Sequence, residues 1–295
     1  MLLGGLEAGG TKMVCAVGDE NGKLIDRKVF PTETPDVTIP AMISYFKDFP
    51  VEAIGIGSFG PLDLDRKSET FGYITSTPKP FWGNVNLRGA FLEEFHIPVG
   101  IDTDVNGAAL AEATWGAGAG CDVVLYITIG TGVGVGVCIG GKLLHGLVHP
   151  EAGHILLEKL PNDTYSGKCP FHPNCLEGLA AGPAIEGRWG KKAIELADSE
   201  GVWKMEAEYV SQALVNYILT YSPNKIVLWG GVMHQPQLFP MIRNGVVNKL
   251  NGYIRHDAIV KNIEEYIVAP KLGDDPGIMG ALRLGYLEMM NSSKL

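Results

Sequence analysis

The 295-residue sequence has no long hydrophobic run, no cluster of basic residues and few cysteines, and each absence excludes a class of protein. The longest apolar segments, such as residues 123–129, have the length of a strand and are far short of a membrane span. A net charge of -9, without grouped lysine and arginine, argues against a nucleic-acid surface. A strand-like segment carrying Glu7 and Lys12 follows Met1 directly, so we find no secretory leader and expect a cytoplasmic protein.

Three of the five cysteines stand alone in apolar surroundings, at Cys15, Cys121 and Cys138. Free cysteine is among the most buried residue types and behaves as a small hydrophobic side chain. We therefore expect these three to be core residues and not reactive thiols.

The other two cysteines belong to a short segment that also contains histidines. Cys169, His172 and Cys175 form a Cys-x-x-His-x-x-Cys pattern, and His154 lies upstream. Thiolate and neutral imidazole are preferred zinc ligands, so we interpret the four residues as one zinc site. A disulfide between the two cysteines is the alternative, which a reducing cytosol disfavours. Because protein side chains fill all four positions, we expect a structural site that orders its loop and not a zinc hydrolase.

Two glycine-rich turns each join a pair of predicted strands. They are Gly9-Gly10-Thr11-Lys12 and Gly130-Thr131-Gly132, and they lie roughly 120 residues apart. This repeat predicts a duplicated chain whose two α/β halves face each other across a cleft. Bare backbone N–H groups can approach phosphate closely, which favours phosphate binding, although a simple tight hairpin is the alternative. Neither turn opens a helix, as a Walker loop or a dinucleotide fingerprint would.

A strand predicted at residues 98–102 leads to a helix predicted at residues 107–115. The polar residues Thr103, Asp104 and Asn106 lie between them. Capping of the helix is the simple interpretation of Asp104 and Asn106. Several polar groups in so few residues exceed what one cap needs, and a carboxylate at a strand end is well placed to act as a base.

Further predicted elements alternate along the chain, which predicts α/β sheets with covered faces. Gly60 follows the strand predicted at residues 53–58, at the end where open α/β sheets bind ligands. The loop with Phe81, Trp82 and Asn84 suits a sugar, and a loop packed by its own aromatic residues is an equal alternative. Gly230 and Gly231 end a buried strand and are a third candidate nucleotide contact. Helices are predicted at residues 34–49, 206–221, 236–250 and 277–290, with a broken helix at 176–197.

Taken together, six segments resemble the ROK family of sugar kinases and repressors. They are Glu7 to Lys12, Thr103 to Asn106, residues 129–134, Glu151 to His154, Cys169 to Glu177, and Gly230-Gly231. The resemblance covers essentially the whole chain. It implies the actin-like ATPase, or ribonuclease H-like, α/β fold, with duplicated lobes at residues 1–116 and 117–295 around a central cleft. The C-terminal helix could pack back on the first lobe.

The fructokinase branch of the family, which often also accepts mannose, is the nearest. The Cys-x-x-His-x-x-Cys form of the zinc segment is typical of that branch. Two positions depart from the common pattern, because Glu7 replaces an aspartate and Thr103 replaces an asparagine. The resemblance implies ATP-dependent phosphorylation of a hexose, most closely D-fructose to fructose 6-phosphate, with Asp104 as the general base.

The resemblance also implies the ligands and the assembly. Sugar contacts are expected from Gly60, Asn84, Thr103, Asn106, Glu151, His154 and Glu177. Contacts to ATP are expected from Gly9, Gly10, Thr11, Lys12, Gly130, Thr131, Gly132, Gly230 and Gly231. Magnesium is expected near Glu7 and Asp104, structural zinc at His154, Cys169, His172 and Cys175, and the chain is expected to form a homodimer.

Alternative functions within the family are a mannokinase or glucokinase, a noncatalytic sugar sensor, and a sugar-responsive repressor. Repressors carry a winged-helix segment before the first phosphate motif, whereas the first strand here is expected to begin at Leu2 or Leu3. The presence of Asp104 and of both glycine turns favours an enzyme over a sensor.

Overall fold

The computed structural model describes residues 1–292, which form two α/β units. Unit 1 comprises Met1–Ala119, Gly136–Pro150 and the C-terminal segment from Leu272; unit 2 comprises Gly120–Val135 and Glu151–Lys271. The predicted boundary after residue 116 lies near the first division, but Gly136–Pro150 and the C-terminal segment belong to unit 1. Among the described residues, no helix is long and apolar enough to cross a membrane.

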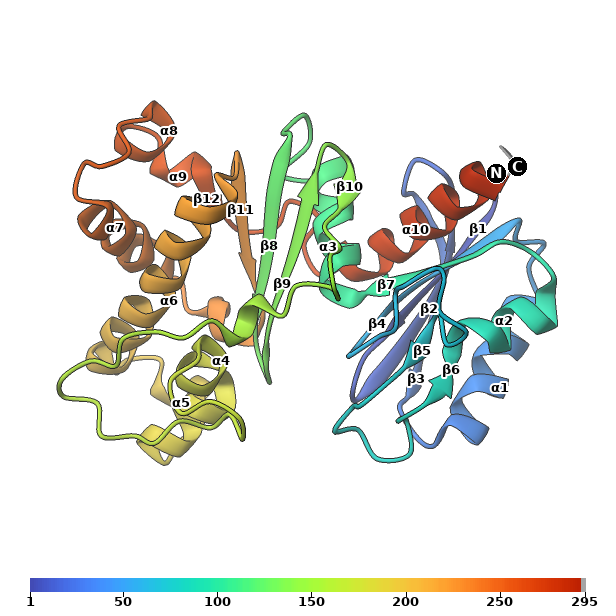
Figure 1. Ribbon diagram of the computed structural model, residues 1–295, viewed down its shortest axis with the longest axis horizontal. Coiled ribbons are helices and arrows are strands. Elements are labelled where there is room, and N and C mark those ends of the chain that lie inside the picture. Colours follow the sequence, from blue (N-terminus) through green and yellow to red (C-terminus); the bar gives the residue numbers. More distant parts are fainter. Residues whose placement is uncertain (293–295) are drawn as a thin grey trace. The chain divides into compact units, whose positions relative to one another are not determined.

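The sheet of unit 1 has five strands in the order β3-β2-β1-β4-β7 (Figure 1). Their bounds are Leu24–Pro31 for β3, Lys12–Gly18 for β2, Leu3–Ala8 for β1, Ala53–Ser58 for β4 and Val99–Thr103 for β7. β1 pairs antiparallel with β2 and parallel with β4. This confirms the antiparallel pair joined by the first glycine turn and the strands predicted at 53–58 and 98–102. A further pair, β5 (Tyr73–Ile74) and β6 (Val85–Asn86), was not predicted.

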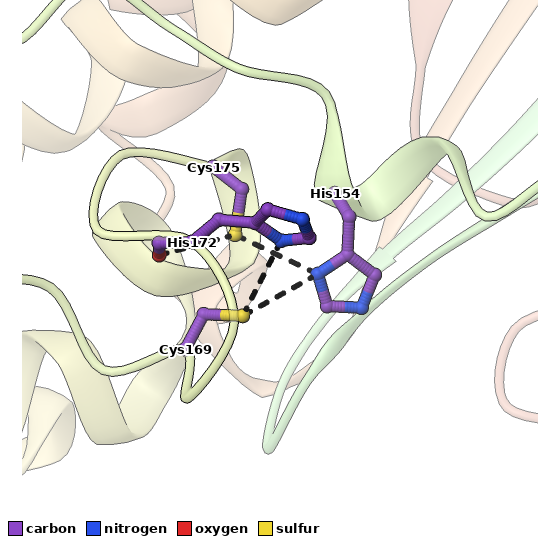
Figure 2. Close-up of side chains that lie close together, drawn as sticks. All are labelled: His154, Cys169, His172 and Cys175. Carbon is purple, nitrogen blue, oxygen red and sulfur yellow. Dashed lines mark hydrogen bonds between the residues drawn. The ribbon is translucent and has the colours of Figure 1, made fainter.

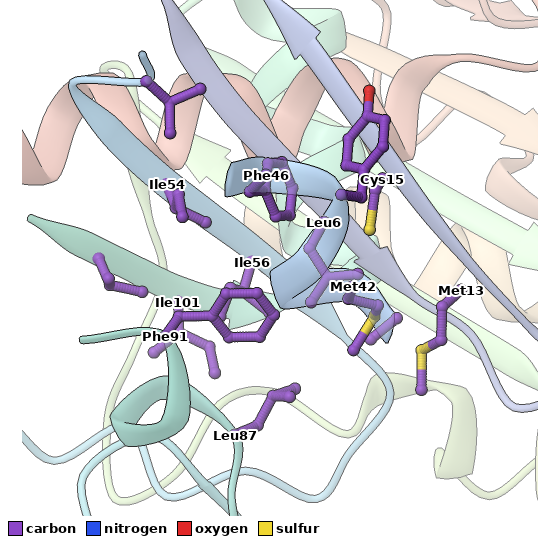
Figure 3. Packing of buried hydrophobic residues seen from close by; sticks show 14 of the residues in the cluster. Leu6, Met13, Cys15, Met42, Phe46, Ile54, Ile56, Leu87, Phe91 and Ile101 are labelled. Carbon is purple, nitrogen blue, oxygen red and sulfur yellow. The ribbon is translucent and has the colours of Figure 1, made fainter. Parts of the chain in front are cut away.

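Helices cover both faces of this sheet, because both faces of its central strands are apolar. On one face, Leu6 and Met13 pack in the core that Figure 3 shows, together with Phe46 of α1 (Pro35–Lys47) and Phe91 of α2 (Leu87–Phe95). On the other face, Val14 and Ala16 pack against Ile278 and Ala281. These two residues belong to α10 (Pro276–Ser292), the predicted C-terminal helix, which thus packs on the first unit.

Glycines allow α10 to approach the sheet and α3 (Asp104–Thr114) closely. A Cβ atom at Gly55 of β4 would overlap the backbone of Ala281, and one at Gly280 would overlap the backbone of Gly107 in α3. Any larger residue at either position would push the helix away. α10 therefore packs closely against both the sheet and α3.

The second sheet has the order β10-β9-β8-β11-β12, and the division between the units falls within β9. The strands are Lys142–Leu143 for β10, Val133–Ile139 for β9, Val123–Ile129 for β8, Lys225–Trp229 for β11 and Ile267–Val268 for β12. In each sheet, three consecutive antiparallel strands come first in the chain. The next two strands then add in parallel beside the first strand of that group. The repeated plan confirms the predicted duplication.

Six α-helices and three 3-10 segments complete unit 2. They are η1 (Ala152–His154), α4 (Leu176–Ala180), α5 (Gly182–Trp189), η2 (Ala193–Leu196), α6 (Glu200–Tyr221), η3 (Gly231–His234), α7 (Leu238–Leu250), α8 (Asp257–Val260) and α9 (Ile263–Tyr266). The predicted broken helix is thus α4, α5 and η2. α6 begins six residues earlier than predicted.

Candidate functional site

The four predicted zinc ligands come together in unit 2 (Figure 2). Their ligand atoms all lie within 4.8 Å of one another. His154 Nδ1 lies 3.7 Å from the Cys169 sulfur and 3.6 Å from the Cys175 sulfur, and His172 Nδ1 lies 3.7 Å from the Cys169 sulfur. In a zinc tetrahedron, bonds of about 2.3 Å to sulfur and about 2.0 Å to nitrogen place N and S about 3.5 Å apart. The donor set and its spacing therefore fit zinc.

Local structure explains how Cys175 reaches this position. It is the N-cap of α4, and its sulfur accepts a hydrogen bond of 3.3 Å from the backbone N–H of Gly178. Gly178 also packs closely against the Cys169 loop, because a Cβ atom there would lie 3.1 Å from the Cβ of Cys169. The loop that carries Cys169 can thus lie directly on the first turn of α4.

Glu177 links this cluster to the second glycine turn. Its Oε2 accepts from the backbone N–H of Val133 at 3.0 Å, and its Oε1 lies 3.9 Å from His154 Nε2. His154 therefore directs Nδ1 toward the thiols and Nε2 toward a carboxylate, which is the common arrangement of a metal-bound histidine. Glu151, also a predicted sugar contact, is exposed and precedes η1.

A pocket of about 450 Å³ lies beside the second glycine turn, also in unit 2. It is lined by Gly130, Thr131, Gly182, Pro183, Glu186, Lys192, Ala193, Ile194, Gly231 and Val232. Its volume is in the range of small-molecule sites. The pocket brings together Gly130, Thr131 and Gly231, which the sequence assigned to the nucleotide from segments far apart in the chain. Pro183, Glu186 and Lys192 were not predicted.

Gly132 and Gly230, two further predicted nucleotide contacts, shape the backbone beside this pocket. Gly132 accepts a hydrogen bond of 2.9 Å from the N–H of Gly130, which closes the turn. Gly230 has φ of 99°, and a Cβ atom there would overlap the backbone of Ile129. Only glycine fits this position without strain.

The first glycine turn lies in unit 1 between β1 and β2. The N–H of Gly9 donates to the carbonyl of Lys12 at 3.0 Å, and Lys79 donates to the carbonyl of Gly10. Gly10, Thr11 and Lys12 are exposed. Glu7 lies just before this turn, and burial raises its pKa, an effect that Lys12 and Arg27 oppose.

Asp104 occupies the first turn of α3, three residues before the predicted start of that helix. The N-cap is Thr103, whose hydroxyl accepts from the N–H of Asn106 at 3.2 Å, so the interpretation of Asp104 and Asn106 as caps is wrong. Asp104 is partly exposed, and its Oδ1 accepts from the N–H of Val105 at 2.9 Å. Thr103, and not Asp104, therefore caps α3.

The other predicted sugar contacts of unit 1 differ in exposure. Asn106 is buried, with Oδ1 3.4 Å from the N–H of Val137. Asn84 is exposed at a left-handed backbone position with φ of 61°. Gly60 lies near His149, whose Nε2 accepts from the N–H of Leu62 at 3.3 Å.

The two aromatic residues of the loop predicted to bind sugar differ in exposure. Trp82 is fully buried, contacts Phe59 and donates to the carbonyl of Glu33 at 2.8 Å, so it packs the loop. Phe81 is 76% exposed and is the aromatic residue of this pair that a ligand could reach.

Comparison with known proteins gives consistent matches over the whole chain. The ROK family model matches residues 3–286. A fructokinase of Pediococcus pentosaceus is 46% identical over 292 residues, covering 99% of this chain and 100% of that protein. A fructokinase of Streptococcus mutans is 42% identical over 293 residues, covering 98% and 97%.

Solved structures give the same result. A ROK hexokinase from Thermus thermophilus is similar with a TM-score of 0.83 and 30% identity, covering 99% of this chain and 100% of that one. A ROK family glucokinase from Streptomyces griseus, in complex with glucose and AMPPNP, has a TM-score of 0.75 and 26% identity, covering 97% and 100%.

Proposed function

We propose that this chain, which belongs to the ROK family, phosphorylates a hexose with ATP and converts D-fructose to fructose 6-phosphate. The observation that carries this proposal is the similarity to two fructokinases along nearly the full length of the chain. The hexokinase and glucokinase structures agree with a sugar kinase, and the AMPPNP complex of the latter supports ATP as the phosphoryl donor.

Asp104 is the proposed general base. In phosphoryl transfer a carboxylate accepts or orients the proton of the attacking hydroxyl, while donors around the phosphoryl group stabilise its charge. Asp104 is suited to this because it is partly exposed at the first turn of α3, and Thr103 supplies the helix cap in its place. The Asp104 carboxylate would take the proton as the hexose oxygen attacks the terminal phosphorus of ATP.

The nucleotide is assigned to the pocket of unit 2 and to the two glycine turns. In unit 2 the pocket has a suitable volume and is bordered by the backbone of Gly130 and Gly231. In unit 1 the exposed turn at Gly10 to Lys12 offers backbone N–H groups and one ammonium group. Glu7 and Asp104 carry carboxylate oxygens, which magnesium prefers, and bound magnesium would neutralise charge on the phosphates.

Zinc is the metal that the cluster of His154, Cys169, His172 and Cys175 fits. Its proposed role is structural: it would order the loop that carries Glu151, His154 and Glu177. These residues, with Gly60, Asn84, Thr103 and Asn106, are the proposed contacts to sugar hydroxyls. A cytoplasmic location and a homodimer stay predictions from the sequence.

Mannose and glucose are the second candidate substrates, since the similar solved structures include a hexokinase and a glucokinase. The test is ADP release with magnesium and ATP across fructose, mannose, glucose and N-acetylmannosamine. Highest activity with fructose would support the proposal, and highest activity with glucose or mannose would support the alternative. Absence of activity with every sugar, in protein shown to contain zinc, would contradict both and favour a noncatalytic sensor.

A further inference from the structure

A buried polar network lies beside the first turn of α3 in unit 1, and its central carboxylate has no part in the proposed chemistry. Its centre is Asp102, the fourth residue of β7, whose side chain is almost fully buried. Asp102 Oδ1 accepts from the backbone N–H of Thr103 at 2.8 Å and from the side chain of Asn106 at 2.7 Å. These two residues flank Asp104, so the carboxylate of Asp102 holds both sides of the turn that carries the proposed base.

The other oxygen of Asp102 pairs with a histidine from a distant part of the chain. His145 Nε2 lies 2.8 Å from Asp102 Oδ2, and the hydrogen bond to Asp102 raises the pKa of His145. His145 follows β10 in a surface loop, where Leu147 is completely exposed. The imidazole thus connects a surface loop to a buried carboxylate.

A buried carboxylate depends strongly on its partners. Taking a charge out of water costs several kcal/mol unless hydrogen bonds and an opposite charge replace the lost hydration. Removing His145 would therefore leave Asp102 Oδ2 without this hydrogen bond and favour rotation of the Asp102 side chain. Rotation would move the oxygen that accepts from Thr103 and Asn106.

We propose that His145 is a positioning residue: it holds Asp102 in place, and Asp102 fixes the turn Thr103 to Asn106 from which Asp104 acts. The inference rests on the proposed kinase function. It predicts that His145 affects turnover without touching the hexose or ATP. A displacement of the base by about 1 Å is enough to slow a reaction about a hundredfold.

The test compares His145→Leu with His145→Gln, because glutamine can still offer an N–H to Asp102. We expect His145→Leu to lower kcat between about tenfold and about a hundredfold, with the KM for ATP unchanged. His145→Gln should recover most of kcat. Leu147→Ser is the matched control in the same loop, and it should behave as the wild type because Leu147 is fully exposed.

Two results would overturn the inference: wild-type kcat in His145→Leu, or equal impairment in the leucine and glutamine variants. A lower melting temperature with unchanged kcat would show a purely structural tether and would also overturn it. If His145→Leu does not fold, His145→Ala takes its place: Asp102→Asn should lower kcat, and adding His145→Ala to it should cost nothing further; additive losses would contradict the link. A wild type inactive on every hexose contradicts the proposed function instead.

Discussion

Replacing Glu206 with glutamine is expected to stabilise the protein at neutral pH. Glu206 lies within α6 and is 2% exposed, and its Oε1 has no hydrogen-bond partner among the described residues. Burial raises its pKa well above the ordinary 4.5, and the positive charge of Arg188 opposes this only in part. The fold therefore holds a carboxyl group in a place that disfavours its ionised form.

The direction of the pH dependence follows from the raised pKa. Below pH 4.5 the group is protonated in both the folded and the unfolded chain, so its contribution to stability is fully present there. As the pH rises, the unfolded chain ionises first, and stability is lost until the pH reaches the pKa of the folded state. At about 1.4 kcal/mol per pH unit, the interval from 4.5 to pH 7 limits this loss to about 3 kcal/mol.

Glutamine has nearly the same shape and does not titrate, so Glu206→Gln removes this loss. The expected gain in the free energy of unfolding is about 1 to 3 kcal/mol at pH 7 and less than about 1 kcal/mol at pH 5. Urea unfolding followed by far-UV circular dichroism at both pH values measures it. The comparison with wild type at each pH cancels other titrating groups that the two proteins share.

Glu200→Gln is the control in the same helix. Glu200 is exposed and pairs with Lys204 at 2.7 Å, and this hydrogen bond lowers the pKa of Glu200. Replacing Glu200 should lower the free energy of unfolding only slightly, because exposed ion pairs contribute little to stability. The reasoning about Glu206 is refuted if Glu206→Gln gives no gain at pH 7, or a gain that is the same at pH 5.

Three further substitutions test the proposed sites. Asp104→Asn should lower kcat about a hundredfold or more with sugar binding kept, as measured by ADP release and calorimetry; near-normal turnover would remove Asp104 from the mechanism. Cys169→Ser should release zinc, measured as metal content, whereas Cys121→Ser should not; unchanged metal in the first variant would contradict the four-ligand site. Gly231→Leu should raise the KM for ATP at least about tenfold, because a Cβ atom added at this pocket-lining position meets no other atom and the leucine side chain can occupy the pocket. Gly201→Leu, at an equally open glycine in α6, should not.

The strands of this protein could be predicted because their signals are local. Apolar runs at residues 3–8 and 123–129 are followed by glycine turns and second strands, and the same plan appears in both sheets. Helix starts were harder to predict. α3 begins at Asp104 because Thr103 caps it, a competition between neighbouring polar residues that only the backbone geometry resolves. α6 begins at Glu200, before its amphipathic pattern becomes clear.

Contacts between distant segments were the least predictable. His145 lies in the loop after β10 and Asp102 lies within β7, and neither residue type nor spacing indicates that they pair. The assignment of Gly136–Pro150 to unit 1 was missed for the same reason: part of β9 contacts α3, where a side chain at Gly136 would overlap the backbone of Val105. The sequence shows a glycine in a strand and cannot show which backbone needs the space.

The Cys/His cluster could be predicted from the sequence because three of its four residues lie within seven positions, yet its connection to the glycine turn required the structure. Cys175 caps α4, which places Glu177 in the first turn of that helix, and Glu177 then accepts from the N–H of Val133 beside Gly132. A side chain at Gly132 would lie 2.7 Å from this carboxylate. Because Cys175 caps α4 and Glu177 lies in the first turn of the same helix, the position of Cys175 determines where Glu177 meets the second glycine turn. If zinc holds Cys175, it also fixes the carboxylate against which that turn rests, so the metal can order a nucleotide contact without touching the nucleotide.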